Sequence, residues 1–286
     1  TPKLAQKYLN KRSDIFDELI IDEFLKRNLE NDFAIVALGG YGRRELFPSS
    51  DIDLSIIQLI KKTKKIDDIK DFVGWLWTLK VKIGHSVRTV KDIDKITRAD
   101  LKEFTSYLSY RIIYCNKNKF NDLNQNLKKI SSNWNKTKFF KAKKLEQLGR
   151  YQSFDSTEFS LEPDLKESPG CLRDFQTALW ILEHCFEIKK LEDCIKNRLF
   201  NKTEIENVKK SYGHIKSLRY ILNLNGNSNR ISFENQLLLA KKSKLRSSKK
   251  ASAVEKFMRT FFLHASNLSD FNELVFQAYE DQLTIL

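Results

Sequence analysis

The sequence is poor in the residues that build metal and disulfide sites. Its 286 residues include only four cysteines and four histidines, and no two cysteines are spaced as a CxxC pair. The histidines are scattered too, so the paired ligand spacing of a structural zinc site is missing. Isolated thiols are typical of a reducing compartment, and we therefore expect a cytoplasmic protein.

Long apolar stretches and an N-terminal leader are also missing. No run approaches the roughly 18 apolar residues that a membrane span needs. The opening segment, TPKLAQKYLNKRSDIF, has no apolar core to serve as a signal peptide and no initiator methionine. We therefore expect no membrane association, and we expect the chain to be a piece of a longer protein.

Positive charge is in excess. There are 51 lysines and arginines against 37 aspartates and glutamates, a formal net charge of +14. Such a charge suits a nucleic acid, an acidic protein or a phosphate-rich substrate. The densest lysine runs, Lys61–Lys65 and Lys241–Lys250, lack the interleaved aromatic residues that stack on bases. We interpret both runs as solvated loops, and nucleic acid is the partner that the sequence favours least.

The first hundred residues alternate between helical and strand-like patterns. Helical spacing of apolar residues covers residues 14–29 and 67–79, and short apolar runs typical of strands cover residues 33–38, 51–59 and 81–90. The third run is interrupted by a glycine, and a short helical segment fits between the first two. This alternation predicts a small α/β domain.

After about residue 100 the pattern changes. Candidate strands stop, and residues 172–186 and 254–268 keep an apolar period of 3.6 residues. We therefore predict an α+β fold with two domains, an α/β domain over residues 1–100 and an all-helical bundle domain over residues 101–286.

Two aspartates open the second predicted strand, within ALGGYGRRELFPSSDIDLSII (residues 37–57). Residues two apart in a strand share a face, so Asp51 and Asp53 project together while Ile52 and Leu54 face the core. Two carboxylates about 7 Å apart on one face repel each other unless a cation lies between them. Mg²⁺ suits this face, since it prefers one or two carboxylates together with phosphate oxygens and water.

The glycines before the aspartates suit a phosphate. Gly39, Gly40 and Gly42 permit positive φ angles and let backbone N–H groups approach an anion closely. A Rossmann fingerprint would need a glycine where Glu45 stands, and no GxxxxGK[ST] motif occurs, which excludes a P-loop.

The combined spacing of glycines and aspartates resembles the nucleotidyltransferase superfamily related to DNA polymerase β. More specifically, GGYGRRELFPSSDIDL is similar to the hallmark of the bacterial PII-protein uridylyltransferase family. Three later blocks also resemble that family: GHSVRT (84–89), LEPDLKESPGCLRDFQTALW (161–180) and NRISFENQLLLAK (229–241).

This resemblance implies transfer of UMP from UTP to a tyrosine hydroxyl of the signalling protein PII, with release of pyrophosphate, in nitrogen regulation. It implies a polymerase-β-like fold for the α/β domain. Gly39, Gly40 and Ser50 would bind the triphosphate, and Asp51 and Asp53 would be the catalytic residues that bind Mg²⁺.

Three cations are further nucleotide-binding candidates by the same resemblance, for phosphate or transition-state charge: Arg88, Lys166 and Arg173. For the proton of the tyrosine, with an ordinary pKa near 10, Asp53 or a metal-bound hydroxide is the candidate acceptor. His85 fits better as a structural residue of the third strand.

The sequence departs from the family pattern at several positions. Arg44 replaces a glycine, where it would add a phosphate contact or crowd the turn, and Cys171 replaces a glycine where a special backbone angle is expected. The superfamily's third carboxylate has no counterpart in the third strand, which leaves Glu162 and Asp164 as substitutes.

Full-length family members also carry a His-Asp phosphohydrolase domain and ACT domains. No His-Asp dipeptide occurs in this chain, so we expect it to lack uridylyl removal and glutamine sensing. Two alternatives stay open: a degenerate, non-catalytic binding module of the same fold, and an adenylyltransferase acting on glutamine synthetase. The blocks GHSVRT and LEPDLKESPG favour the uridylyltransferase over the latter.

Overall fold

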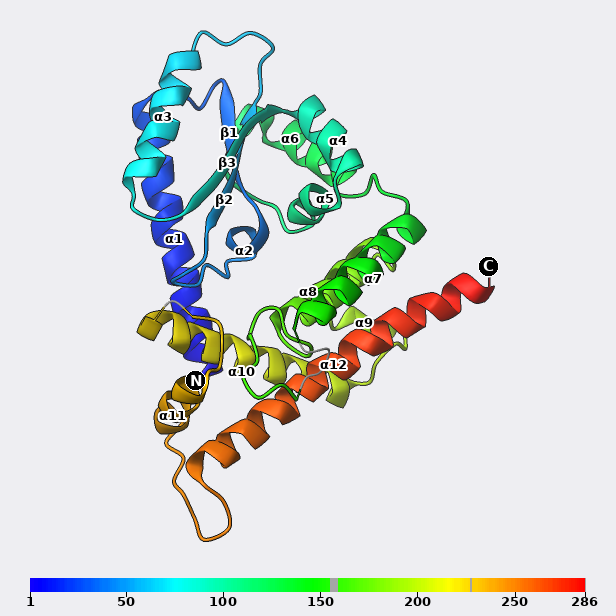
Figure 1. Cartoon of the computed structure of the whole chain (residues 1–286). Coiled ribbons are helices and arrows are strands. Elements are labelled where there is room, and N and C mark those ends of the chain that lie inside the picture. Colours follow the sequence, from blue (N-terminus) through cyan, green and yellow to red (C-terminus); the bar gives the residue numbers. More distant parts are fainter. Residues whose placement is uncertain (155–158, 227, 286) are drawn as a thin grey trace. The chain divides into compact units, whose positions relative to one another are not determined.

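The chain forms two compact units. The sheet unit comprises Lys7–Trp134, and the helical unit comprises Thr1–Gln6 together with Asn135–Leu286. Both are drawn in Figure 1. The computed structural model describes residues 1–154, 159–226 and 228–285.

The sheet unit contains a four-stranded mixed sheet. Its elements in chain order are α1 (Pro2–Lys26, of which the part from Lys7 on belongs to this unit), β1 (Phe33–Ala37), α2 (Gly39–Gly42), β2 (Ile52–Gln58), α3 (Ile66–Thr78), β3 (Ile83–Thr89), α4 (Val90–Ala99), α5 (Leu101–Leu108), β4 (Arg111–Tyr114) and α6 (Lys117–Ile130). The strand order is β3-β2-β1-β4, with β2 and β3 parallel and the other pairs antiparallel. Every residue of β1 is buried, as expected for an apolar run inside a sheet.

A hydrophobic core covers each face of this sheet. On one face Ile52, Leu54 and Ile56 of β2 pack with residues of α1 and α3. On the other face Ile57 packs with residues of α4 and α6 and with Tyr107 of α5. Figure 1 shows these two groups of helices on opposite sides of the sheet. The mixed α/β class and the strands predicted at residues 33–38 and 51–59 are confirmed.

Two expectations for this unit are wrong. Strands do not stop near residue 100, because β4 pairs with the free edge of β1. All four residues of β4 are only half-buried, so their sequence carries no clear period. The third strand is not interrupted at Gly84, which pairs in register with Asp53 of β2. The sheet unit thus extends to Trp134, past the change in pattern.

The helical unit is arranged around its last and longest helix. Its elements are α7 (Lys136–Ser153), α8 (Leu172–His184), α9 (Asp193–Lys196), α10 (Lys202–Gly226), α11 (Phe233–Lys242) and α12 (Ala253–Ile285). α12 contacts α8, α10 and α11. The helices predicted to begin at Leu172 and to include residues 254–268 are confirmed. Among the described residues, no helix is both long enough and apolar enough to cross a membrane.

Two histidines meet inside the helical unit. The ring centroids of His214 in α10 and His264 in α12 lie 4.2 Å apart. His264 Nδ1 is 3.0 Å from the hydroxyl of Ser211, whereas the buried Nε2 of His214 has no hydrogen-bond partner within the described residues. Burial lowers the pKa of His214 to about 4, and the positive charges of His264 and Lys210 add to this shift. Folding therefore favours neutral His214.

We expect the helical unit to lose stability as the pH falls from 6.5 towards 4. In this window His214 takes up a proton in the unfolded chain, at its ordinary pKa of 6.5, but stays neutral in the folded one. At pH 5 this difference lowers the unfolding free energy by about 2 kcal/mol. Urea unfolding near neutral pH and at acid pH, followed by circular dichroism, measures the loss. His214→Phe, which keeps a ring, should lose less than the wild type; an equal loss would contradict this prediction.

Candidate active site

The glycine turn after β1 depends on backbone geometry that a side chain would obstruct. Leu38 is extended, with φ −119° and ψ 168°, and Gly39 takes a φ of +53°. Only glycine adopts that left-handed angle without steric cost, so the chain turns directly from β1 into α2. At the end of α2, a Cβ on Gly42 would lie 1.9 Å from the carbonyl oxygen of Ser109. The helix α2 is therefore packed backbone to backbone against the residue after α5.

The two aspartates lie at the start of β2. Asp51 and Asp53 are exposed, and Ile52 between them is fully buried, so the predicted alternation is confirmed. A Cβ on Gly39 would lie 3.2 Å from Asp53 Oδ2, and one on Gly84 would lie 2.9 Å from Asp53 Oδ1. The Asp53 carboxylate thus fills space that two absent side chains leave.

A cavity of about 450 Å³ opens beside Asp53. It is also lined by Gly84, Ser86 and Arg88 of β3 and by Glu103 of α5. Gly84 of β3 pairs with Asp53 of β2 in the sheet. Because residues two apart in a strand share a face, Ser86 and Arg88 lie on the same face of the sheet as Asp53. The cavity therefore brings together one predicted metal ligand and one predicted phosphate-binding cation.

Three charged residues that line this cavity were not predicted from the sequence, Asp100, Lys102 and Glu103, and Glu103 is the one that pairs with Arg88. Its two oxygens accept hydrogen bonds from Arg88 Nη1 at 2.8 Å and Nη2 at 3.3 Å. Hydrogen bonding to Glu103 raises the pKa of Arg88, which keeps the guanidinium charged. No signal in the sequence distinguishes Glu103, because only the packing of α5 beside β3 brings it to Arg88.

Gly40 and Ser50 flank the same turn. A Cβ on Gly40 would be 3.5 Å from the carbonyl oxygen of Glu45, an ordinary contact. Ser50 is half-buried, and its N–H donates to the carbonyl of Phe47 at 2.9 Å. The predicted site residues that belong to the sheet unit are Gly39, Gly40, Ser50, Asp51, Asp53 and Arg88. Those of the helical unit are Lys166 and Arg173.

The backbone accommodates both departures from the family pattern. Arg44 takes a φ of +58°, the angle that a glycine would adopt more easily, and its guanidinium pairs with Asp14 and lies 3.9 Å from Asp17. Its charge is thus directed to α1. Cys171 has an ordinary extended backbone, with φ −101° and ψ −167°, and the left-handed angle falls on Gly170, with φ +70°. The expectation of a special backbone angle at position 171 is therefore wrong.

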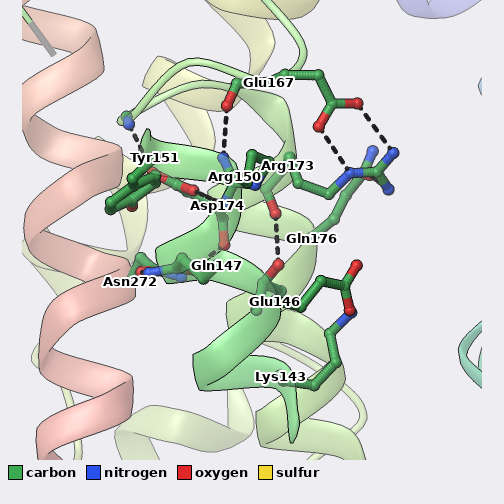
Figure 2. Close-up of polar contacts among 12 residues, drawn as sticks. Lys143, Glu146, Gln147, Arg150, Tyr151, Glu167, Arg173, Asp174, Gln176 and Asn272 are labelled. Carbon is green, nitrogen blue, oxygen red and sulfur yellow. Dashed lines mark hydrogen bonds and ion pairs between the residues drawn. The ribbon is translucent and has the colours of Figure 1, made fainter. Parts of the chain in front are cut away.

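Lys166 and Arg173 share one carboxylate. Glu167 lies 3.4 Å from Lys166 Nζ and 3.2 Å from Arg173 Nη2. Burial would raise the pKa of Glu167, but the charges of Arg173 and Lys166 outweigh it and lower that pKa. Figure 2 shows the two hydrogen bonds between Glu167 and Arg173.

The segment that carries these residues is anchored by a fully buried aspartate. Asp174, in the first turn of α8, accepts hydrogen bonds from Arg150 at 2.5 Å, from the hydroxyl of Tyr151 at 2.6 Å and from the N–H of Gly170 at 2.6 Å (Figure 2). Burial raises the pKa of Asp174, although Arg150 and Tyr151 oppose the shift. The network fixes the start of α8 to the end of α7.

Both suggested substitutes for a third carboxylate have structural partners in the helical unit. Glu162 pairs with Arg230 at 3.2 Å. Asp164 Oδ1 accepts the N–H of Lys166 at 2.8 Å and that of Glu167 at 2.9 Å, which closes a turn. In the part of the chain that the structure describes, no group of three or more His, Cys, Asp or Glu side chains is arranged to hold a metal ion.

The start of β2 nevertheless fits Mg²⁺ as a donor set. Asp51 and Asp53 provide two exposed carboxylates, and the absent Cβ atoms of Gly39 and Gly84 make room for the second, which borders the cavity. Two protein carboxylates are sufficient for Mg²⁺ when substrate phosphates and water complete its six ligands.

We expect Gly42→Ala to destabilise the chain by at least about 2 kcal/mol, because the new methyl group would overlap the backbone oxygen of Ser109 and force the backbone apart. Gly74→Ala in α3 is the matched control. Its methyl group would meet nothing within 4 Å, and alanine should stabilise the helix by about 0.5–1 kcal/mol. Urea unfolding compares the two variants, and similar effects of the two substitutions would disprove the close packing of α2.

Comparison with known proteins supports the resemblance. Residues 138–276 match the family model of GlnD PII-uridylyltransferase. The chain is 32% identical over 280 residues to a bifunctional uridylyltransferase/uridylyl-removing enzyme of Haemophilus influenzae. The aligned region covers 96% of this chain and 32% of that protein. An enzyme of the same name from Nitrosococcus oceani is 33% identical over 257 residues, 88% of this chain and 29% of that protein.

The resemblance predicted from four sequence blocks is thereby confirmed, and the named relatives are nucleotidyltransferases. The chain spans about a third of the length of these relatives. It is therefore a homologue of the PII-uridylyltransferases, related to a third of the bifunctional enzyme along almost its own whole length.

Proposed function

We propose that this chain is the nucleotidyltransferase part of a PII uridylyltransferase. In this proposal it transfers UMP from UTP to a tyrosine hydroxyl of the PII protein with the help of Mg²⁺, in the cytoplasm, as a step of nitrogen regulation. The sheet unit is then a nucleotidyltransferase domain of the polymerase-β type.

The observation that carries the proposal is the position of Asp53. Its carboxylate lies between two glycines, at the opening of a ligand-sized cavity and on the same exposed end of β2 as Asp51. In this proposal the exposed carboxylate pair next to the tight glycine turn holds a cation against the phosphates of the substrate. The named relatives are uridylyltransferases, which fits this proposal.

Each residue of the sheet unit has a role in this proposal. Gly39, Gly40 and Ser50 bind the triphosphate, since the first N–H groups of α2 have no preceding helical turn to accept them. Asp51 and Asp53 hold Mg²⁺, which when bound supplies positive charge to the phosphate oxygens. Arg88 adds a permanent positive charge at the wall of the same cavity.

The chemistry asks little else of the protein. The tyrosine oxygen forms a bond to the α-phosphorus, the bond from that phosphorus to the bridging oxygen breaks, and pyrophosphate leaves. The hydroxyl proton passes to a carboxylate, for which Asp53 is our candidate, and from there to solvent. Positioning and charge therefore provide most of the catalysis, as in other phosphoryl transfers.

Two assignments rest on the family resemblance alone. Lys166 and Arg173 stay predicted phosphate ligands, and both already pair with Glu167. A second candidate function is a binding module without catalysis. The pairing of Arg88 with Glu103 favours it, because a guanidinium already paired with a carboxylate attracts phosphate less strongly.

We expect the purified chain, with Mg²⁺ and PII, to incorporate label from α-labelled UTP and from no other nucleotide. Asp51→Asn/Asp53→Asn should lower the rate by a factor of about a thousand or more, because the metal's charge stabilisation is worth several kcal/mol. The rate of label transfer to PII, measured for each of the four nucleotides, tests both statements.

The matched control is Asp22→Asn/Asp71→Asn, which removes two exposed carboxylates from α1 and α3 and should leave the rate unchanged. Label from ATP would favour the adenylyltransferase alternative. No label from any nucleotide, with protein that circular dichroism shows to be folded, would favour the binding module. Full activity of Asp51→Asn/Asp53→Asn would disprove the metal site.

A further inference from the structure

A second crevice in the sheet unit follows from its topology. β2 and β3 are parallel and end side by side, with Gln58 paired to Thr89. The chain after β2 continues into α3, whose apolar side joins one core, and the chain after β3 continues into α4, whose Ile93 joins the other. Figure 1 shows α3 and α4 on opposite sides of the sheet. In open α/β sheets, ligands bind where neighbouring strands send their connections to opposite faces, at the carboxyl ends.

A cavity of about 570 Å³ lies at this point. Gln58 and Thr89, the last residues of the two strands, line it, together with the loop after β2, the first turn of α4 and α6. Its volume falls within the range of small-molecule sites, about 300–1,000 Å³. The crevice is thus large enough for an organic ligand.

The charge of the lining favours an anion. Lys61, Lys91 and Lys119 come from three different elements, and the one carboxylate among the lining residues is that of Asp122. Asp122 accepts a hydrogen bond from Asn126, another lining residue, at 3.3 Å. Lys119 Nζ donates to a backbone carbonyl at 2.7 Å, which uses one of its three protons. The structure gives Lys61 and Lys91 no ion pair within the described residues.

The rest of the lining is apolar. Leu59, Ile60, Val90 and Leu123 form walls between the lysines. The crevice has no arginine and no glycine, the residues that usually hold a bare phosphate by bidentate bonds or backbone N–H groups. Lysines above apolar walls instead suit a molecule with an apolar body and a single anionic end.

We propose that this crevice is a binding site for a small amphiphilic organic anion, separate from the Asp53 site. The anionic group lies among Lys61, Lys91 and Lys119, and the apolar body packs against Leu59 and the other apolar walls. Gln58 is five residue steps beyond Asp53 in β2, which is about 16 Å along the strand. The two sites thus lie at opposite ends of β2, and the proposal is independent of the proposed transferase activity.

The test uses the whole chain and the fluorescent anion 8-anilinonaphthalene-1-sulfonate, whose aromatic body and sulfonate match the lining. We expect saturable binding to the wild type and at least a fivefold higher Kd for Lys61→Gln/Lys91→Gln. The control is Lys62→Gln/Lys95→Gln, which removes the same charge from the same loop and the same helix but outside the lining. Equal weakening in both double variants, or in neither, would overturn the proposal.

Two further measurements fix the chemistry and the place of the site. Octanoate should displace the probe at concentrations where acetate and inorganic phosphate do not, at constant ionic strength; equal displacement by all three would refute the part assigned to the apolar walls. Asp53→Asn should bind the probe as the wild type does. Loss of binding in that variant would place the probe in the other cavity and overturn the proposal.

Discussion

The geometry of the sheet unit's candidate site depends on three glycines at which a Cβ would meet the backbone or a carboxylate at close range. Gly42 lets α2 touch the carbonyl of Ser109, and Gly39 and Gly84 make room for the carboxylate of Asp53. These contacts connect α2, β2, β3 and the end of α5 around one point. The geometry of the site thus follows from the absence of side chains at three positions, and a single methyl group at any of them would move the site.

Each unit also contains one aspartate held by an arginine and a tyrosine hydroxyl. The two sets are Asp17 with Arg111 and Tyr41, and Asp174 with Arg150 and Tyr151. Burial, with help from the neighbouring aspartate, raises the pKa of each tyrosine and keeps its hydroxyl a donor. Breaking such a buried pair costs about 3–5 kcal/mol, because the remaining charge is left without a partner. The first set holds α2 to α1 and β4, and the second fixes the loop before α8. Two of the four segments that resemble the family are thus held in place by the same kind of contact.

Much of the sheet unit follows from sequence pattern, but the packing faces do not. Residues 33–38 and 51–59 read as strands because one is continuously apolar and the other alternates behind an aspartate pair. The sequence does not predict β4, because its four residues are all half-buried and show no alternation of apolar and polar side chains. The sequence predicts a helix over residues 14–29, whereas α1 spans Pro2–Lys26. Within the shared part Ile15 and Leu19 are 51% and 41% exposed, while Ile20 and Phe24 are buried. Apolar spacing indicates a helix, but the rotation of that helix is decided by what packs on it.

The sequence by itself indicated the resemblance to the uridylyltransferases, the strand that follows Asp51 and carries Asp53, and the turn that precedes it, because these depend on residues close together in the chain. Tertiary structure alone decided that Glu103 meets Arg88, that Gly84 makes room for Asp53, and that lysines from three elements line one crevice. The physical reason is distance along the chain. Local backbone preferences and side-chain periods act over a few residues, whereas a cavity is made by segments that only the packing of the whole unit brings together.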